Sequence, residues 1–280
     1  MTAESSDPVP AITEAKAEGS TAAIFADIRE TLGVEVVNLV WRHLATMPGA
    51  LEWAWGELKP LYHGAAVAPA AGIRGSLALP NVTAFSIDTL AAAGVDQNAR
   101  RDIRDILESY YHTNALALVA FSSLLARHDG APAHTETAAH ATQDATGSQA
   151  VRAKLPRLTP MSELDPPVAR LIVELNSYGE DKDPAVLASM YRHLSHWPAY
   201  LALVRTMLAP LQSSGQLQSL VDAARRTGRI QGMALAPLLA GSKPPTATAA
   251  VALAAVRRFV EHPIARMTGL CALMRQATPR

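Results

Sequence analysis

An internal duplication with an offset of 150 residues limits the folds that are open to this chain. When residues 186–211 are set against residues 36–61 without gaps, nine of 26 positions are identical, whereas common-residue composition gives roughly two by chance. The identical pairs include Arg42 with Arg192, His43 with His193 and Pro48 with Pro198. Two similar halves imply a pseudo-twofold arrangement, and the cleft where they meet is a natural place for a ligand.

The periodic segments of both halves are helical in character. Alanine, leucine, glutamate and arginine dominate them, and aromatic residues make up only 5% of the chain, a balance that favours helix over strand. In the first half we predict helices over about 21–32, 35–46, 48–64, 86–93 and 97–127. Thr46 and Asp96 are expected to cap two of them. Both halves close with a long apolar helix, and Pro263 must kink or interrupt the second. We therefore expect an all-α fold of two pseudo-repeated halves.

Composition divides the chain into four parts. Residues 1–19 are acidic and lack the basic and apolar regions of a secretory signal, so we expect a disordered N-terminal segment. A first helical repeat follows over 20–128. Residues 129–160 are rich in Gly, Ala, Thr and Pro without apolar periodicity, which is typical of a linker. The second helical repeat covers 161–280.

The charge balance and cysteine content exclude several classes of function. The 25 basic side chains are matched by 25 acidic ones, so no net field attracts phosphate backbones or anionic lipid. We therefore expect neither a nucleic-acid partner nor a membrane partner. The single cysteine, Cys271, rules out an internal disulfide framework and multi-thiolate metal sites. It also fits a reducing compartment, and we predict a cytoplasmic protein.

The most informative polar residue is Asn114, on the long helix of the first half. It interrupts an apolar stripe whose spacing of three and four residues marks one helix face. The stripe consists of Ile103, Leu107, Tyr110, Asn114, Leu118, Phe121 and Leu125. A carboxamide among apolar groups needs hydrogen-bond partners. A neighbouring backbone carbonyl is one candidate, and a bound substrate or water is the other.

Other polar residues favour structural roles. His43 and His193 recur within an Arg-His-Leu triplet, which is more typical of a packing unit than of a base or metal pair. His128, His134 and His140 recur every six residues, which is not a helical ligand spacing. Cys271 lies in an apolar run without a cationic neighbour, which favours an inert buried thiol. The acidic residues Glu180, Asp181 and Asp183 precede Pro184 and are typical of a solvated loop, with a nucleophile or base pair as the alternative. We predict no metal and no cofactor.

An ordered series of residues extends from about residue 20 to residue 276. In the first half the series comprises Asp27-Ile28-Arg29, Thr31-Leu32, Arg42, Leu44-Ala45-Thr46, Pro48-Gly49, Leu51, Ala54-Trp55, Leu79-Pro80-Asn81, Ala92-Ala93-Gly94 and Asn114. In the second half it comprises Trp197-Pro198, Leu201, Leu208-Ala209-Pro210 and Arg258-Phe259. This series resembles the group I 2-haloacid dehalogenases.

The resemblance implies a two-repeat helical fold, similar to alkylhydroperoxidase-like helical proteins and often assembled as a homodimer. Members of the family remove halogen from small 2-haloalkanoic acids by means of an aspartate that activates water, and an asparagine positions that water. Asn114 matches the asparagine. The aspartate lies seven residues before the Trp-Pro pair in the family, and Met190 occupies that position here. A thioether cannot act as a general base.

The resemblance also places substrate-contacting residues on the second helix. Aromatic residues are expected there, but this chain has Val36 and Leu39 beside Asn38. The expected ligand is a small organic acid, and two hypotheses about the function of the chain stay open. The chain is either a dehalogenase-like hydrolase that uses another carboxylate, or a scaffold without standard dehalogenase activity that binds an acid or another protein. Thiol peroxidase chemistry would need a Cys-x-x-Cys pair, which is absent.

Overall fold

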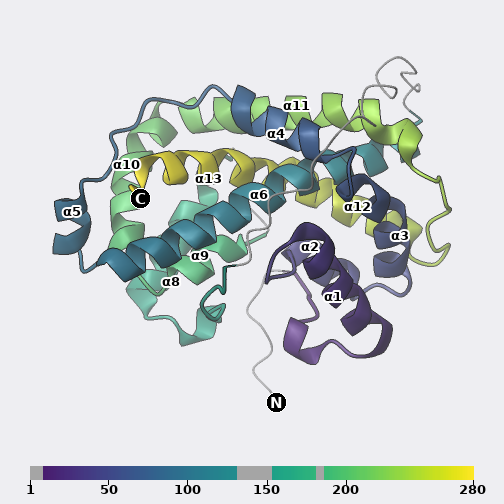
Figure 1. Ribbon diagram of the computed structural model, residues 1–280, viewed down its shortest axis with the longest axis horizontal. Coiled ribbons are helices and arrows are strands. Elements are labelled where there is room, and N and C mark those ends of the chain that lie inside the picture. The colour runs from purple at the N-terminus through teal and green to yellow at the C-terminus, as the bar shows by residue number, and fades with distance from the viewer. Residues whose placement is uncertain (1–8, 131–152, 181–185) are drawn as a thin grey trace.

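The computed structural model describes residues 9–130, 153–180 and 186–280, and every regular element in these ranges is a helix (Figure 1). The elements of the first half are η1 (Glu14–Lys16), α1 (Gly19–Leu32), α2 (Leu39–Leu44), α3 (Ala50–Tyr62), α4 (Val67–Ser76), α5 (Ile87–Ala92) and α6 (Gln97–His128). Those of the second half are η2 (Met161–Glu163), α8 (Pro166–Ser177), α9 (Ser189–Leu194), α10 (Pro198–Ser213), α11 (Gln216–Leu235), η3 (Ala236–Leu238), α12 (Ala249–Phe259), the π-helical η4 (Val260–Ile264) and α13 (Ala265–Ala277). The predicted all-α fold class is confirmed.

The two halves begin with the same order of elements. A short 3-10 turn, a helix, a six-residue helix and a longer helix occur as η1, α1, α2 and α3, and again as η2, α8, α9 and α10. Equivalent histidines make equivalent contacts, because His43 Nδ1 lies 2.7 Å from the carbonyl oxygen of Pro10 and His193 Nδ1 lies 3.0 Å from that of Pro156. In both cases the histidine ties the six-residue helix to the segment that precedes the half.

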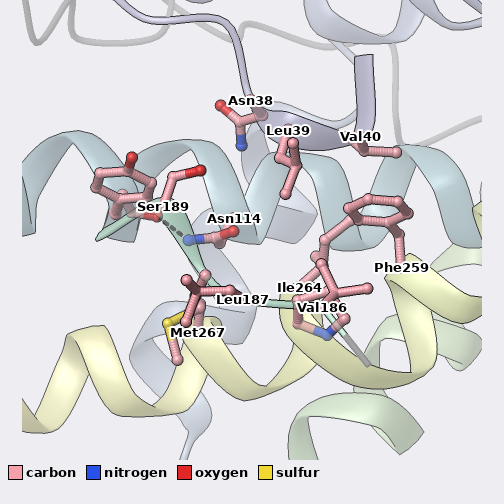
Figure 2. Close-up of a pocket in the computed structure, with 13 residues that line it drawn as sticks. Asn38, Leu39, Val40, Asn114, Val186, Leu187, Ser189, Phe259, Ile264 and Met267 are labelled. Carbon is pink, nitrogen blue, oxygen red and sulfur yellow. Dashed lines mark hydrogen bonds between the residues drawn. The ribbon is translucent and has the colours of Figure 1, made fainter. Parts of the chain in front are cut away.

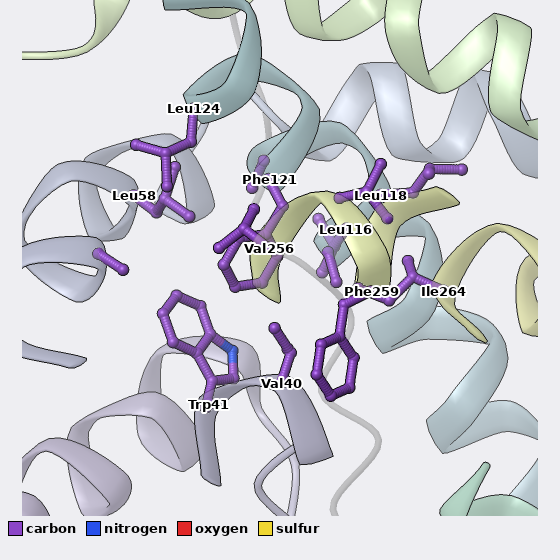
Figure 3. Packing of buried hydrophobic residues seen from close by; sticks show 14 of the residues in the cluster. Val40, Trp41, Leu58, Leu116, Leu118, Phe121, Leu124, Val256, Phe259 and Ile264 are labelled. Atoms are coloured by element: carbon purple, nitrogen blue, oxygen red, sulfur yellow. The ribbon is translucent and has the colours of Figure 1, made fainter. Parts of the chain in front are cut away.

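The halves interlock through their last helices. The N-terminal part of α6, with Ile103 and Leu107, belongs to a hydrophobic cluster formed mainly by α8, α9, α10 and α13. Its C-terminal part joins the core of the first half, where Phe121 packs against Trp41 with ring centroids 4.6 Å apart (Figure 3). Helix α12 contributes Phe259 to that same core. Each half is therefore completed by helices of the other.

Helices α6 and α11 approach closely because two glycines on α11 leave space for α6. A Cβ atom on Gly232 would lie 2.5 Å from the backbone of Ser122, and one on Gly228 would lie 2.6 Å from Leu118 Cγ. These two glycines stand one helical turn apart on one face. They allow the close packing of α11 against α6.

Several local predictions agree with the structure. The helix predicted over 86–93 is present as α5, and Asp96 caps α6 as predicted by accepting a hydrogen bond from Ala99 N–H. Ser86 caps α5 in the same way by accepting one from Thr89 N–H. Pro263 interrupts the last long helix, because it lies inside the π-helical turn that separates α12 from α13. A proline lacks the N–H for an α-helical bond, and a π-turn accommodates that loss.

Other local predictions were wrong. Thr46 does not cap α3, because its hydroxyl donates to the His43 carbonyl and Gly49 is the N-cap residue with a φ of 73°. Helix α4 was not predicted, because glycines and a proline interrupt the apolar pattern to which its buried residues Ala70 and Ile73 belong. The segment predicted to be disordered has structure from Val9 onward, where Val9 is buried in the core. Residues 1–8 lie outside the described residues, as does most of the predicted linker.

Candidate functional site

A small pocket lies where the two halves meet, with a cavity volume of about 40 Å³. It is lined by the start of α2, the middle of α6, the segment that leads into α9, and the region from the end of α12 into α13 (Figure 2). The lining residues are Asn38, Leu39, Val40, Tyr110, Asn114, Val186, Leu187, Ala188, Ser189, Phe259, Pro263, Ile264 and Met267. A volume of this size holds a few water molecules or a ligand of a few heavy atoms.

The pocket has a polar end and an apolar end. In Figure 2, Asn38, Asn114 and Ser189 lie toward one side, and Val40, Phe259 and Ile264 gather on the other. A pocket of this kind suits a molecule with a polar head and a short apolar body.

Asn114 projects into the pocket from the middle of α6. Its Nδ2 atom donates a hydrogen bond of 2.8 Å to the Tyr110 carbonyl oxygen, one turn earlier in the same helix. This is the structural partner expected for a carboxamide on an apolar stripe. An amide has two N–H donors and one oxygen acceptor, so the Asn114 Oδ1 atom retains the capacity to accept a hydrogen bond from a ligand or water.

Ser189 supplies a hydroxyl group at the same end. Arg42, a buried residue, donates from Nη2 to Ser189 Oγ over 3.2 Å. Because Oγ accepts this bond, the Ser189 hydroxyl hydrogen is left to donate elsewhere. The Tyr110 hydroxyl is buried without a hydrogen-bond partner. Burial raises the pKa of Tyr110, while the charge of Arg42 opposes that rise, so the phenol keeps its proton.

Met190 does not line the pocket. Its side chain is fully buried, and its Sδ atom lies 3.2 Å from Cys271 Sγ. Burial raises the pKa of the Cys271 thiol, and a bond from the Asn114 side chain opposes that rise. The thiol is buried, as predicted. Successive residues of a helix point about 100° apart. The start of α9 therefore presents Ser189 to the pocket and turns Met190 toward the core.

The predicted substrate-contacting residues of the second helix fall into two groups. Asn38 and Leu39 line the pocket. Val36 is half-buried and is not among the lining residues. The chain turns between these positions because Val37 is held on both sides: its N–H donates to Glu14 Oε1 over 2.8 Å and its carbonyl accepts from Arg42 Nε over 3.1 Å.

Of the three acidic residues that could supply a base, the structure describes only Glu180. Glu180 is not among the lining residues, and its Oε2 atom pairs with Arg225 Nη2 at 2.8 Å. Asp181 and Asp183 lie outside the described residues. Among the described lining residues there is no Asp, Glu, Lys or His.

The histidines do not form a site in the part of the chain that the structure describes. His43 and His193 each bind a backbone carbonyl. His128 packs edge-on against the Trp53 ring with centroids 5.4 Å apart, while His134 and His140 lie outside the described residues. No cluster of His, Cys, Asp and Glu among the described residues could hold a metal ion. No helix there is long and apolar enough to cross a membrane.

Sequence reasoning missed the second-half wall of the pocket. Val186, Leu187, Ala188 and Ser189 line it, and none was expected to be a site residue. The duplication carried the signal, because an offset of 150 residues pairs Asn38 with Ala188 and Leu39 with Ser189. Applying the repeat to all three predicted contacts of the first half, including Val36, would have identified Val186, Ala188 and Ser189.

Several known proteins that are similar to this chain are 2-haloacid dehalogenases. No family model matches the chain. A stretch of 55 residues is 40% identical to an (R)-2-haloacid dehalogenase of Pseudomonas putida, and it covers 19% of this chain and 18% of that relative. The matched stretch is thus less than a fifth of either protein.

Solved structures extend the similarity to the whole fold. The complex of a D-2-haloacid dehalogenase mutant with D-2-CPA matches with a TM-score of 0.74 over 99% of this chain and 98% of its own, at 14% identity. The complex of D-2-haloacid dehalogenase with L-LA matches with a TM-score of 0.72 over 100% of this chain and 98% of its own, also at 14% identity. The chain therefore has the all-helical fold of D-2-haloacid dehalogenase and shares a short homologous stretch with an (R)-2-haloacid dehalogenase.

Proposed function

We propose that this chain is a 2-haloacid dehalogenase-like protein that binds a small carboxylic acid between its two halves and lacks standard dehalogenase activity. The observation that carries the proposal is the composition of the pocket. Its polar end offers side-chain amide and hydroxyl groups, and its described lining residues include no carboxylate or imidazole. Such a pocket recognises an acid but has no group to activate water.

The polar groups fit a carboxylate because several of them can donate. The Ser189 hydroxyl carries an O–H group and the Asn38 amide carries N–H groups, and a carboxylate accepts on both oxygens. The apolar side chains at the other end suit a short alkyl or haloalkyl body. These features agree with the resemblance to group I 2-haloacid dehalogenases.

The missing chemistry is the general-base step. Halide displacement by water requires a group that removes a proton from the attacking water. The resemblance assigns that role to the position of Met190, whose side chain is apolar and turned toward Cys271. Asn114 retains an acceptor that would hold a water molecule, but an amide oxygen does not take up a proton near neutral pH.

Titration of the purified protein tests the proposal directly. The ligands are both enantiomers of 2-chloropropionate, and the uncharged 2-chloropropionamide is the matched control. Binding is measured from changes in the NMR spectrum of the protein. We expect saturable binding of an acid and about tenfold weaker binding of the amide, the ratio for a charge-assisted hydrogen bond worth about 1.4 kcal/mol. We also expect no chloride release from either enantiomer. Equal binding of acid and amide, or no binding of either, would contradict the proposed ligand class.

A second candidate is an active hydrolytic dehalogenase that uses another carboxylate. It is favoured by sequence adjacency, since Asp181 and Asp183 precede the lining residue Val186 by only a few positions. Chloride release by the natural chain that disappears in the Asp181→Asn, Asp183→Asn double variant would establish it. A protein that neither binds nor hydrolyses the acid would instead fit a non-catalytic interaction scaffold. Cytoplasmic location and homodimer assembly stay predictions.

A further inference from the structure

A buried carboxamide holds the second-half wall of the pocket, together with a longer contact of 3.4 Å from Arg266 Nη2 to the Val186 carbonyl oxygen. Asn176, near the end of α8, is only 4% exposed. Its Nδ2 atom donates to the Val186 carbonyl oxygen over 3.1 Å, and its Oδ1 atom accepts from the Ala188 N–H over 3.0 Å. One side chain therefore satisfies two backbone groups on either side of Leu187. Both of the residues that it binds line the pocket.

A buried arginine determines which way this carboxamide faces. Arg266 on α13 has no exposed surface, and its Nη2 atom donates to Asn176 Oδ1 over 2.9 Å. A flipped amide would turn its NH₂ group toward both the guanidinium and the Ala188 N–H, so that donors would face donors. Arg266 thus selects the orientation that binds the wall. Its neighbour in the chain, Met267, lines the same pocket.

The wall of the first half is held in a related way. Glu14 Oε1 accepts from the Val37 N–H over 2.8 Å, and Glu14 Oε2 is paired with Arg29. In both halves a side-chain oxygen next to an arginine binds a backbone N–H immediately before the six-residue helix that enters the pocket. The second-half version is buried, whereas the Glu14 and Arg29 side chains are 28% and 34% exposed.

From these contacts we propose that Asn176, oriented by Arg266, is a positioning residue that sets the 186–189 wall of the pocket and thereby its affinity for a small acid. The inference rests on the proposed function for its ligand. Asn176 itself does not line the pocket. It acts through Val186 and through Ala188, which immediately precedes Ser189, a hydroxyl donor of the polar end.

The test compares three variants of the full chain. Asn176→Ala removes both wall contacts. Asn176→Asp keeps an acceptor for Ala188 and Arg266 but loses the donor to Val186, and it gives a second chance of a folded variant. Ser177→Ala is the matched control, because the Ser177 hydroxyl bonds only to the Glu174 carbonyl in its own helix, over 2.7 Å. For each we measure the Kd for 2-chloropropionate, hydrogen exchange of the 186–189 amides, and Tm.

We expect Asn176→Ala to weaken binding about tenfold, as the loss of a buried hydrogen bond does, and to speed exchange of the Ala188 amide. Asn176→Asp should keep that amide protected and bind with intermediate affinity, and Ser177→Ala should match the natural chain. Unchanged affinity in a folded Asn176→Ala variant would overturn the inference, even if Tm falls. If the natural chain binds no acid, the proposed function fails separately. Hydrogen exchange then decides whether Asn176 positions the wall, and unchanged Ala188 exchange refutes it.

Discussion

The Sδ atom of Met190 lies 3.2 Å from the Sγ atom of Cys271, inside the core and behind the pocket that contains Asn114. The dehalogenase resemblance assigns a catalytic carboxylate to the position of Met190. In this chain the side chain at that position makes a sulfur-to-sulfur contact instead. Both side chains are fully buried. The contact replaces a charged group by apolar packing, which a buried site tolerates far better than an unpaired carboxylate.

Met190→Asp tests whether only the base is missing. Because the new carboxylate is buried, its pKa should be raised, and the variant should lose about 3 kcal/mol of stability at neutral pH. The destabilisation should increase as pH rises above the ordinary aspartate pKa of about 3.9, because the unfolded state ionises first. Urea unfolding measures this loss, and chloride release from both enantiomers of 2-chloropropionate measures the gain of activity.

Met190→Asn is the control, with similar shape and no charge, and it should release no chloride. Ser189→Asp is a second comparison, because it places the carboxylate at a position that lines the pocket, whereas Met190 does not line it. A folded Met190→Asp variant that binds acid without releasing chloride would show that more than the base is missing.

Asn114→Ala should weaken binding of 2-chloropropionate by about fivefold to tenfold, the range for a lost hydrogen bond of about 1 kcal/mol. Isothermal titration calorimetry gives the Kd. The matched control is Thr113→Val on the same helix. Thr113 is buried and its hydroxyl donates to the carbonyl one turn earlier, as Asn114 does, but it does not line the pocket. Equal effects of the two substitutions would mean that Asn114 acts only on the helix.

His193 should make the protein less stable in acid. Burial, reinforced by the charges of Arg42 and Arg192, lowers the pKa of His193 to about 4, although its bond to the Pro156 carbonyl opposes the shift. The unfolded chain takes up this proton near pH 6.5 and the folded chain only near pH 4. Stability should therefore fall by up to about 3 kcal/mol as pH drops through this interval, with no contribution above it.

His193→Asn keeps a donor for the Pro156 carbonyl but does not titrate, so its stability should vary less between pH 6.5 and 4. Urea unfolding at several pH values compares the two proteins. Parallel stability curves for the variant and the natural chain would refute the assignment to His193.

Gly232→Ala should destabilise the crossing of α6 and α11. A Cβ atom at this position would lie 2.5 Å from the Ser122 backbone, so the helices must separate. We expect a loss of about 2–3 kcal/mol, the cost of overpacking. Gly72→Ala is the control, since a Cβ atom added to this exposed helical glycine would meet no other atom within 4 Å. Replacing glycine by alanine inside a helix should stabilise the chain by about 0.5–1 kcal/mol. Thermal unfolding distinguishes the two outcomes.

Much of the fold was predictable from the sequence, because helix periodicity and capping are local. The apolar stripe around Asn114 predicted a long buried helix, Asp96 predicted where it begins, and Pro263 predicted the break in the last helix. The start of α3 was mispredicted because Thr46 has a second local partner, the His43 carbonyl. Helix α4 was not predicted, because its stability comes from burial of Ala70 and Ile73 against other elements and not from its own sequence.

Residue order is enough to specify an all-helical chain, an asparagine at position 114 within an apolar stripe, and the lack of a carboxylate at position 190. Packing in three dimensions is what directs Ser189 to the pocket and Met190 to Cys271, because a shift of one helical residue changes direction by about 100°. Packing also places Asn176 and Arg266 against the 186–189 wall, through contacts between residues up to 90 positions apart. Such contacts arise where α8 and α13 meet the segment before α9, and local sequence patterns do not encode them.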